Sequence, residues 1–495
     1  MSVETSPVEL ARGRPVATAS GLAAPYVLPL IALGAALLAL LVRLPFLDWP
    51  LTVDEAGYAY GARLWSEGVS LHSDEVWFDR PQGIFVAYRA GMALLGESTE
   101  AIRLLGALWS AATVALVVWL ADRMFDRRVA LVAGAILAVV SAAPAIEGFV
   151  ANAEVFMLLP ATASAGCVWR RRPFAAGLLA GAAIILKPSG AAALLLAAWW
   201  LYRDREPLRV WLRLSLGAAL LPTLALVHGV ATAGVHDYLY ATLLFRLLEG
   251  GSNPLVLSFV VGILATLWVW APLAAAAALG WRRLSGRRRA RSFLLAWLAT
   301  SIVGMAMGGN WWAHYFVQLM PPLVLLVAAE VAATRPAARA DPRALAVGLA
   351  AAAVLFAGLI WPAVSVPRED AITRYLHNEL YLLSDDVAAY LRAEAAPDDQ
   401  VFVALSHASV VYLSERRSSW PYLYSQQTTS IPGAFEDATQ HLEDGVPAFV
   451  VTRPRQLGLL DPDGLLAAAL EGRYERVRRF GEIDAKRTFE VWRRR

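Results

Sequence analysis

Two adjacent carboxylates, Asp54 and Glu55, directly follow the first long apolar segment of the chain. Farther along, Glu154 lies at the start of one apolar segment, and Lys187 lies at a break between two others. A carboxylate can accept the proton of an attacking hydroxyl group, and cations can hold a leaving phosphate whose charge grows as its bond breaks. If these residues share one membrane surface, they suit a reaction of a lipid phosphate, because lipid and water meet there.

Further cationic and aromatic residues lie near the ends of apolar segments. Arg80 precedes a short apolar stretch, and His314 and Tyr315 open a later one. Lys187 is unusual because the chain contains only one other lysine, Lys486, and uses arginine everywhere else. These side chains are candidates for holding a phosphate group.

The acidic candidates also have ordinary structural explanations. Asp54 and Glu55 could simply begin a solvated helix, where carboxylates favour the helix dipole. Glu154 could be a polar residue at the end of a membrane span. The position of the acidic pair at a membrane exit favours the chemical interpretation for Asp54 and Glu55.

The basic candidates have such explanations too. Lys187 could extend to the membrane interface, as lysines at helix ends do. His314 and Tyr315 could belong to an aromatic belt, and Arg80 could form a loop ion pair. Arg246 is expected to be a surface charge.

The composition indicates a polytopic membrane protein. Of 495 residues, 58% are hydrophobic and 17% are charged, with a mean hydropathy of +0.50. Soluble domains are about a quarter charged, so the excess apolar surface cannot all be hidden from water. This excludes a soluble enzyme, a disordered protein and a disulfide scaffold, and the net charge of +3 is too small to indicate a nucleic-acid partner. The single cysteine, Cys167, excludes an intrachain disulfide.

The hydropathy pattern predicts a bundle of about eleven membrane spans. The apolar segments are at about 25–47, 101–121, 128–145, 152–168, 174–186, 188–202, 210–233, 254–280, 292–308, 314–333 and 343–363. The positive-inside rule puts all the arginine-rich loops in the cytoplasm only if Pro81–Gly96 does not span. We therefore expect Pro81–Gly96 to be an interfacial or re-entrant helix of the first outer loop, with the N-terminal tail, 1–24, in the cytoplasm. Residues 174–202 could form one long helix, but the arginine-rich flanks and the central proline and glycine favour a hairpin broken at Lys187-Pro188-Ser189-Gly190.

The composition changes after Pro367, where acidic and basic residues mix. Short β-rich runs at Val401–Leu405, Ala448–Thr452 and Thr488–Trp492 predict strands, and Ser384 predicts a helix N-terminus. The fold class is thus mainly α: a transmembrane domain at 25–365 and a small extracytoplasmic α/β domain at 366–495.

The order of these motifs resembles the C-type membrane glycosyltransferases, in the protein-mannosyltransferase and aminoarabinose-transferase branch that uses polyprenyl-phosphate sugars. The resemblance covers about residues 25–335 and rests on Asp54-Glu55, Asp79-Arg80-Pro81-Gln82-Gly83, Ala101-Ile102-Arg103-Leu104, Ala151-Asn152 with Glu154, Lys187-Pro188, and His314-Tyr315 with Pro321-Pro322. The chain departs from the family in having Pro-Gln-Gly where two prolines are usual, and a glutamate at 154 where aspartate is common.

The resemblance implies an inverting transfer of a sugar from a polyprenyl-phosphate carrier in the cell membrane to an acceptor hydroxyl on the extracytoplasmic face. Asp54 would be the general base, and Glu55 and Glu154 would orient the acceptor or the sugar. The donor phosphate would be bound by Lys187, Arg80, His314 and Tyr315. The sugar stays open, as does the nature of the acceptor, which could be a glycan, a lipid or a protein.

Two other classes of function stay open at this stage. A transporter or lipid flippase usually shows paired repeats and midplane charges, whereas here the acidic residues gather at one face and no repeat is visible. A non-catalytic scaffold for cell-envelope assembly would act through the C-terminal domain. His236, His407 and His441 show no metal-ligand spacing, so no metal or other cofactor is assigned, and a divalent-metal requirement stays open.

Overall fold

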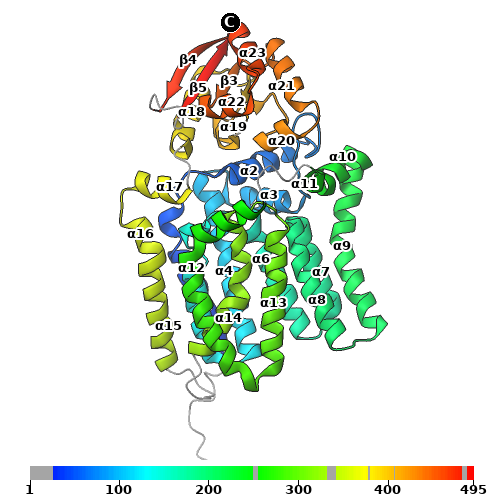
Figure 1. Cartoon of the computed structure of the whole chain (residues 1–495), viewed down its shortest axis with the longest axis vertical. Helices are drawn as coiled ribbons and strands as arrows, with labels where there is room; N and C mark the ends of the chain where they lie inside the picture. The colour runs from blue at the N-terminus through cyan, green and yellow to red at the C-terminus, as the bar shows by residue number, and fades with distance from the viewer. Residues whose placement is uncertain (1–25, 249–254, 332–341, 377–379, 406, 482–487) are drawn as a thin grey trace, which may run out of the picture.

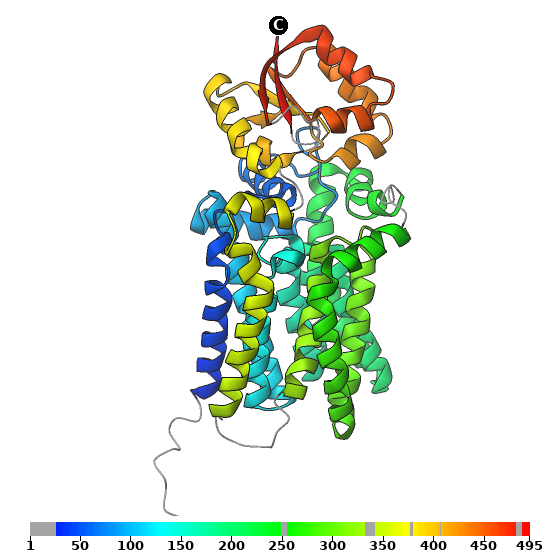
Figure 2. The same ribbon diagram turned by 60° about the vertical axis from the view of Figure 1, so that its left-hand side comes forward.

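The computed structural model describes residues 26–248, 255–331, 342–376, 380–405, 407–481 and 488–495. The chain is mainly helical, with a long helical bundle at one end and a small sheet domain at the other (Figures 1 and 2). The predicted N-terminal tail, 1–24, lies outside the described residues.

Each predicted apolar segment contains a helix of the bundle. These helices are α1 (Val27–Leu41), α4 (Thr99–Met124), α5 (Arg127–Val140), α6 (Ala153–Trp169), α7 (Pro173–Leu186), α8 (Ala191–Arg203), α9 (Leu208–Ala233), α12 (Leu255–Arg283), α13 (Arg288–Ala306), α14 (Met320–Val331) and α15 (Pro342–Leu355). Six described segments are long and apolar enough to span a membrane: Val27–Phe46, Thr99–Met124, Leu208–Ala233, Phe259–Arg282, Ala313–Glu330 and Arg343–Val364. The helices α6 and α7 are apolar but shorter.

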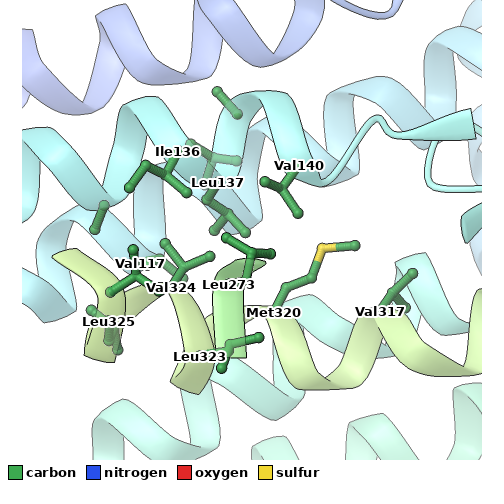
Figure 3. Packing of buried hydrophobic residues seen from close by; sticks show 14 of the residues in the cluster. Val117, Ile136, Leu137, Val140, Leu273, Val317, Met320, Leu323, Val324 and Leu325 are labelled. Atoms are coloured by element: carbon green, nitrogen blue, oxygen red, sulfur yellow. The ribbon is translucent and has the colours of Figure 1, made fainter. Parts of the chain in front are cut away.

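Apolar side chains fill the centre of the bundle and also cover its outside. Side chains such as Val117, Leu137 and Val324 are almost fully buried where α4, α5 and α14 meet (Figure 3). On the periphery, Leu216 of α9 is 66% exposed and Val354 of α15 is 71% exposed. Apolar side chains on both the inside and the outside of a helical bundle are expected where lipid replaces water as the surrounding solvent.

The break at Lys187 forms a hairpin, as predicted. The chain leaves α7 at Leu186, makes a short turn at Pro188–Gly190 and enters α8. A Cβ added to Gly190 would lie 2.4 Å from the backbone of Ala183. This close approach requires the chain to fold back on itself, because residues seven apart in a continuous helix are about 10 Å apart.

The described arginine-rich loops lie together at the end of the bundle opposite the sheet domain (Figure 1), whereas the basic loop with Arg335 and Arg339 lies outside the described residues. Arg171 after α6 forms an ion pair of 3.2 Å with Asp204 after α8. Arg289 of α13 donates to the carbonyl of Trp169 at 3.3 Å. The common location expected for these basic loops is therefore observed.

Between the bundle and the sheet lie α2 (Val53–Ser66) and α3 (Gly83–Leu95), joined by the first outer loop (Figure 1). The helix α3 coincides with the stretch predicted to be interfacial. At the same end of the bundle lie α10 (Val235–Leu239) and α11 (Phe245–Leu248), while α16 (Trp361–Val364) and α17 (Arg368–Leu376) lead from the bundle to the sheet domain.

The C-terminal sheet has the strand order β2-β1-β3-β5-β4. Its strands are β1 (Gln400–Val403), β2 (Arg417–Ser418), β3 (Phe449–Thr452), β4 (Tyr474–Phe480) and β5 (Phe489–Arg494). The strand β1 pairs in parallel with β2 and β3, whereas β5 pairs antiparallel with β3 and β4. Packed with the sheet are α18 (Leu380–Glu394), α19 (Ala408–Ser414), α20 (Ser425–Ser430), α21 (Ala434–Glu443), α22 (Pro454–Leu460) and α23 (Leu465–Arg473).

All three predicted strands are confirmed, but two features of this domain differ from expectation. The strand β4 was not predicted because five of its seven side chains, Glu475, Arg476, Arg478, Arg479 and Tyr474, are polar or charged. The prediction that Ser384 caps a helix is wrong. Ser384 lies inside α18, and its buried hydroxyl donates to the carbonyl of Leu380 at 2.9 Å.

Candidate active site

The acidic pair lies in the first turn of α2, at the end of the bundle that faces the sheet domain (Figure 1). Thr52 precedes the helix and accepts a hydrogen bond from the backbone N–H of Glu55, whose carboxylate accepts one from the backbone N–H of Thr52 at 2.9 Å. This reciprocal capping fixes where α2 begins. It also fixes the directions in which Asp54 and Glu55 leave the helix.

Glu55 is fully buried and its oxygens are used within the protein. It forms an ion pair of 3.0 Å with Arg103 of α4 and accepts a hydrogen bond of 2.7 Å from the backbone N–H of Ala151. Arg103 is 1% exposed and also donates to the carbonyl of Pro50 at 2.7 Å. Glu55 therefore connects α2 to α4 and to the segment that precedes α6.

Asp54 has the opposite environment. It is half-buried, and its carboxylate makes no hydrogen bond or ion pair with any described residue. It lies close enough to Arg80, Lys187 and Tyr424 to interact with them electrostatically. A carboxylate that is held in place but left without a protein partner is available to a ligand.

Arg80 is a half-buried cation that has no carboxylate partner among the described residues. Its guanidinium lies 5.5 Å from the ring centroid of Tyr58, with no ion pair or side-chain hydrogen bond. The backbone around Arg80 is held on both sides: the ring of His72 donates from Nε2 to the carbonyl of Arg80 at 3.1 Å, and Gln82 donates to the carbonyl of Ala225 at 3.1 Å. Burial lowers the pKa of His72 to about 4, so its ring is neutral at pH 7.

Arg246 is not the isolated surface charge expected from the sequence. It forms an ion pair with the buried carboxylate of Asp79 and donates to Gln426 of the sheet domain at 3.1 Å. Burial by itself would raise the pKa of Asp79, but Arg246 and Arg80 hold it below its usual value. The interpretation failed because the partner lies in the first outer loop, far from Arg246 in the sequence.

The remaining predicted residues form one connected group. Glu154, at the N-terminus of α6, forms an ion pair with Lys187. The His314 ring lies on the short 3₁₀ segment Ala313–Leu319, with Nε2 3.7 Å from Glu154 and Nδ1 2.7 Å from Glu147. The ammonium of Lys187 lies 4.1 Å from the ring centroid of Tyr315. Lys187 and Tyr315 both interact electrostatically with Asp54, so this group adjoins the acidic pair.

The structure adds two tyrosines that were not singled out from the sequence. The hydroxyl groups of Tyr58, on α2, and Tyr424, just before α20, are buried and have no hydrogen-bond partner within the described part of the chain. A lone tyrosine carries no recognisable spacing, so only the fold brings Tyr424 to α2. No group of three or more His, Cys, Asp or Glu side chains among the described residues is arranged to hold a metal ion.

A family model described as dolichyl-phosphate-mannose-protein mannosyltransferase matches residues 79–231. The match begins at Asp79 and includes Arg80, Glu154 and Lys187. The comparison with curated proteins finds no match.

Several solved structures share the architecture of the whole chain. ArnT from Cupriavidus metallidurans in the apo state has a TM-score of 0.62 at 17% identity, over 95% of this chain and 98% of that chain. The same protein bound to undecaprenyl phosphate gives 0.60 at 17%, over 94% and 98%. The apo oligosaccharyltransferase of Archaeoglobus fulgidus gives 0.51 at 13%, over 90% and 72%. The chain is a polytopic membrane protein with the fold of ArnT, which confirms, at the level of the fold, its resemblance to the C-type membrane glycosyltransferases.

Proposed function

We propose that the chain is an integral membrane glycosyltransferase that transfers a sugar from a polyprenyl-phosphate carrier to an acceptor hydroxyl. The family-model match and the shared fold support the reaction class, and the undecaprenyl phosphate in the ArnT complex supports the donor. The observation that carries the proposal is that the Asp54 carboxylate and the Arg80 guanidinium lie near each other at one end of the bundle, and that neither has a hydrogen-bond or ion-pair partner among the described residues.

In this mechanism Asp54 removes the proton of the acceptor hydroxyl as the hydroxyl oxygen attacks the anomeric carbon of the sugar. The bond between that carbon and the phosphate oxygen breaks, and the lipid phosphate leaves with the bonding electrons. Configuration at the anomeric carbon is inverted because attack and departure occur on opposite sides. Arg80 and Lys187 stabilise the negative charge that develops on the phosphate.

The other predicted residues hold Lys187 and α2 in position. Glu154 holds Lys187, and His314 connects Glu154 to Glu147. Tyr315 supplies an aromatic face to the Lys187 ammonium. Glu55 was expected to orient the acceptor or sugar; because its oxygens already bind Thr52, Arg103 and Ala151, we assign it a positioning role for α2.

We further propose eleven membrane spans, with the arginine-rich loops in the cytoplasm and the domain at 366–495 on the extracytoplasmic side. The positive-inside rule supports this orientation, since the basic loops gather at the end away from the sheet (Figure 1). The candidate site would lie at the outer membrane surface.

The test is to purify the full chain in detergent and incubate it with a panel of radiolabelled polyprenyl-phosphate sugars. Release of free polyprenyl phosphate from one member identifies both donor and reaction class. Asp54→Asn should lower that rate by about 10²–10⁴-fold, because proton transfer is lost. Asp74→Asn, which changes an exposed carboxylate in the segment between α2 and α3, is the matched control and should be within about twofold of wild type. Equal rates for the Asp54 variant and wild type would exclude Asp54 as the base.

A further inference from the structure

The sheet domain places one side chain directly on α2. A Cβ added to Gly57 would lie 2.2 Å from the hydroxyl oxygen of Tyr424 and 3.1 Å from its ring carbon Cζ. Only a glycine at this position allows the phenol to reach the helix backbone. The Tyr424 hydroxyl thus lies against the first turns of α2, although its residue belongs to the C-terminal domain.

Helix geometry places that hydroxyl beside the candidate base. Residues three and four apart share one face of a helix, so Asp54, Gly57 and Tyr58 lie on the same side of α2. Tyr58 and Tyr424 interact electrostatically with each other and with Asp54 and Arg80. Four functional groups from three parts of the chain therefore adjoin one another.

Three of these groups are hydrogen-bond donors that the described protein leaves unused. The hydroxyls of Tyr58 and Tyr424 are buried without a partner, and the Arg80 guanidinium has no ion pair. Burial and the Asp54 charge raise the pKa of Tyr424 well above its usual value, so its phenol stays protonated and can donate. Leaving several buried donors unsatisfied costs free energy, which a ligand rich in acceptor oxygens recovers.

We propose that the hydroxyls of Tyr58 and Tyr424 join Arg80 in binding the phosphate group of the lipid carrier, so that the C-terminal domain forms part of the active site. This inference rests on the proposed function and extends its donor site. A phosphate group presents several acceptor oxygens and negative charge, which matches two phenols and one guanidinium. A single sugar hydroxyl could not engage all three donors.

Hydrogen bonds between the sheet domain and the region of α2 hold Tyr424 in position. The backbone N–H of Ser418 donates to the Tyr60 hydroxyl at 2.8 Å, and the Ser409 hydroxyl donates to the carbonyl of Leu51 at 3.2 Å. Side chains of α2 and α19 also share one apolar cluster. The domain therefore contacts the chain at Leu51, just before α2, and at Tyr60 in the middle of α2, on either side of Gly57.

The test is a titration of the purified full-length protein in detergent with undecaprenyl phosphate, followed by the fluorescence of its 18 tryptophans. Tyr424→Phe keeps the ring and removes only the donor, and should raise the Kd about 10-fold. Tyr412→Phe is the matched control: it removes a hydroxyl of the same domain that donates to the carbonyl of Glu97 at 2.7 Å, away from Asp54. Its Kd should stay within about twofold of wild type.

Gly57→Ala tests the same contact from the other side. The added methyl group displaces the Tyr424 hydroxyl and should also raise the Kd about 10-fold. In the Tyr424→Phe background, where the oxygen at 2.2 Å is gone, Gly57→Ala should add less than threefold. Independent, multiplying effects would contradict the proposed contact.

The possible outcomes distinguish failure of this inference from failure of the proposed function. An unchanged Kd for Tyr424→Phe overturns the inference, as does a loss confined to turnover, which would place the hydroxyl on sugar or acceptor. If wild type itself does not bind undecaprenyl phosphate, while turning over no polyprenyl-phosphate sugar, the proposed function fails as well.

Discussion

Asp54 and Glu55 are chemically alike and adjacent in sequence, yet they lie in two different regions of the molecule. Glu55 lies in a closed cluster with Thr52, Arg103 and Ala151, in which its oxygens bind protein groups. Asp54 lies in an open cluster with Arg80, Tyr58 and Tyr424, whose side-chain donors and acceptors have no hydrogen-bond partner among the described residues. Successive residues on a helix point about 100° apart, which is sufficient to separate the two regions.

The difference shows how a site can be both firmly held and free to react. The closed cluster fixes the start of α2 by a buried ion pair and a capping box, so the position of Asp54 does not depend on contacts of its own. The open cluster keeps its hydrogen-bonding capacity for a ligand. Substitutions in the two clusters should therefore have opposite signatures, one in stability and the other in binding.

The largest effect is expected in the closed cluster. Glu55→Ala leaves the fully buried Arg103 without its carboxylate, and should lower stability by about 3–5 kcal/mol. Thermal unfolding of the detergent-solubilised protein, followed by circular dichroism, measures this. Asp54→Ala is the control and should unfold close to wild type. A Glu55 variant as stable as the Asp54 variant would remove the distinction between the clusters.

Arg80→Gln tests the open cluster. Losing a charged hydrogen bond to phosphate should weaken undecaprenyl phosphate binding roughly 10- to 100-fold, while the midpoint of unfolding changes little. Titration and thermal unfolding on the same preparation give both quantities. A stability loss as large as that of Glu55→Ala would show that Arg80 is a structural residue.

The buried ring of His72 should make the stability of the protein depend on pH. Burial lowers its folded pKa to about 4, below the usual 6.5, so the folded state favours the neutral ring. Its contribution to stability is complete above about pH 6.5 and is lost as the pH falls from there towards 4, by about 3 kcal/mol in total. Unfolding midpoints measured from pH 4 to pH 7 should therefore fall less steeply in His72→Gln than in wild type. Identical slopes would contradict a buried neutral His72.

The smallest effect is expected where charges are exposed. Arg417 joins the sheet domain to the first outer loop through Glu67 at 2.6 Å and Glu75 at 3.0 Å, and it is 49% exposed. Because water screens such pairs, Arg417→Ala should cost less than about 1 kcal/mol. Unfolding in low and high salt checks this, since any loss should shrink at high salt. A loss comparable to that of Glu55→Ala would show that exposure is not what separates the clusters.

Many of the helices, strands and candidate site residues could be predicted from the sequence alone. Apolar segment lengths predicted the positions of the bundle helices, and the arginine-rich loops predicted which ends of those helices lie together. The β-rich runs predicted β1, β3 and β5. Asp54, Arg80, Glu154, Lys187 and His314 were assigned to one surface by counting spans between them, and the structure brings them near one another.

Other features could not be predicted in this way. Adjacent carboxylates look equivalent in a sequence, and only the position of Arg103 and Ala151 distinguishes Glu55 from Asp54. Arg246 was interpreted as a surface charge because its partner, Asp79, comes from a distant loop. Nothing in the sequence around Tyr424 indicated that it lies near Asp54.

The amino-acid sequence by itself determined that this is a helical membrane protein with acidic and basic groups at one of its surfaces. Those properties follow from local quantities: the length and polarity of a segment, and the sign of the charges beside it. Tertiary structure alone decided which charges neutralise one another and which stay available, because pairing depends on contacts of a few ångströms between residues that are remote along the chain.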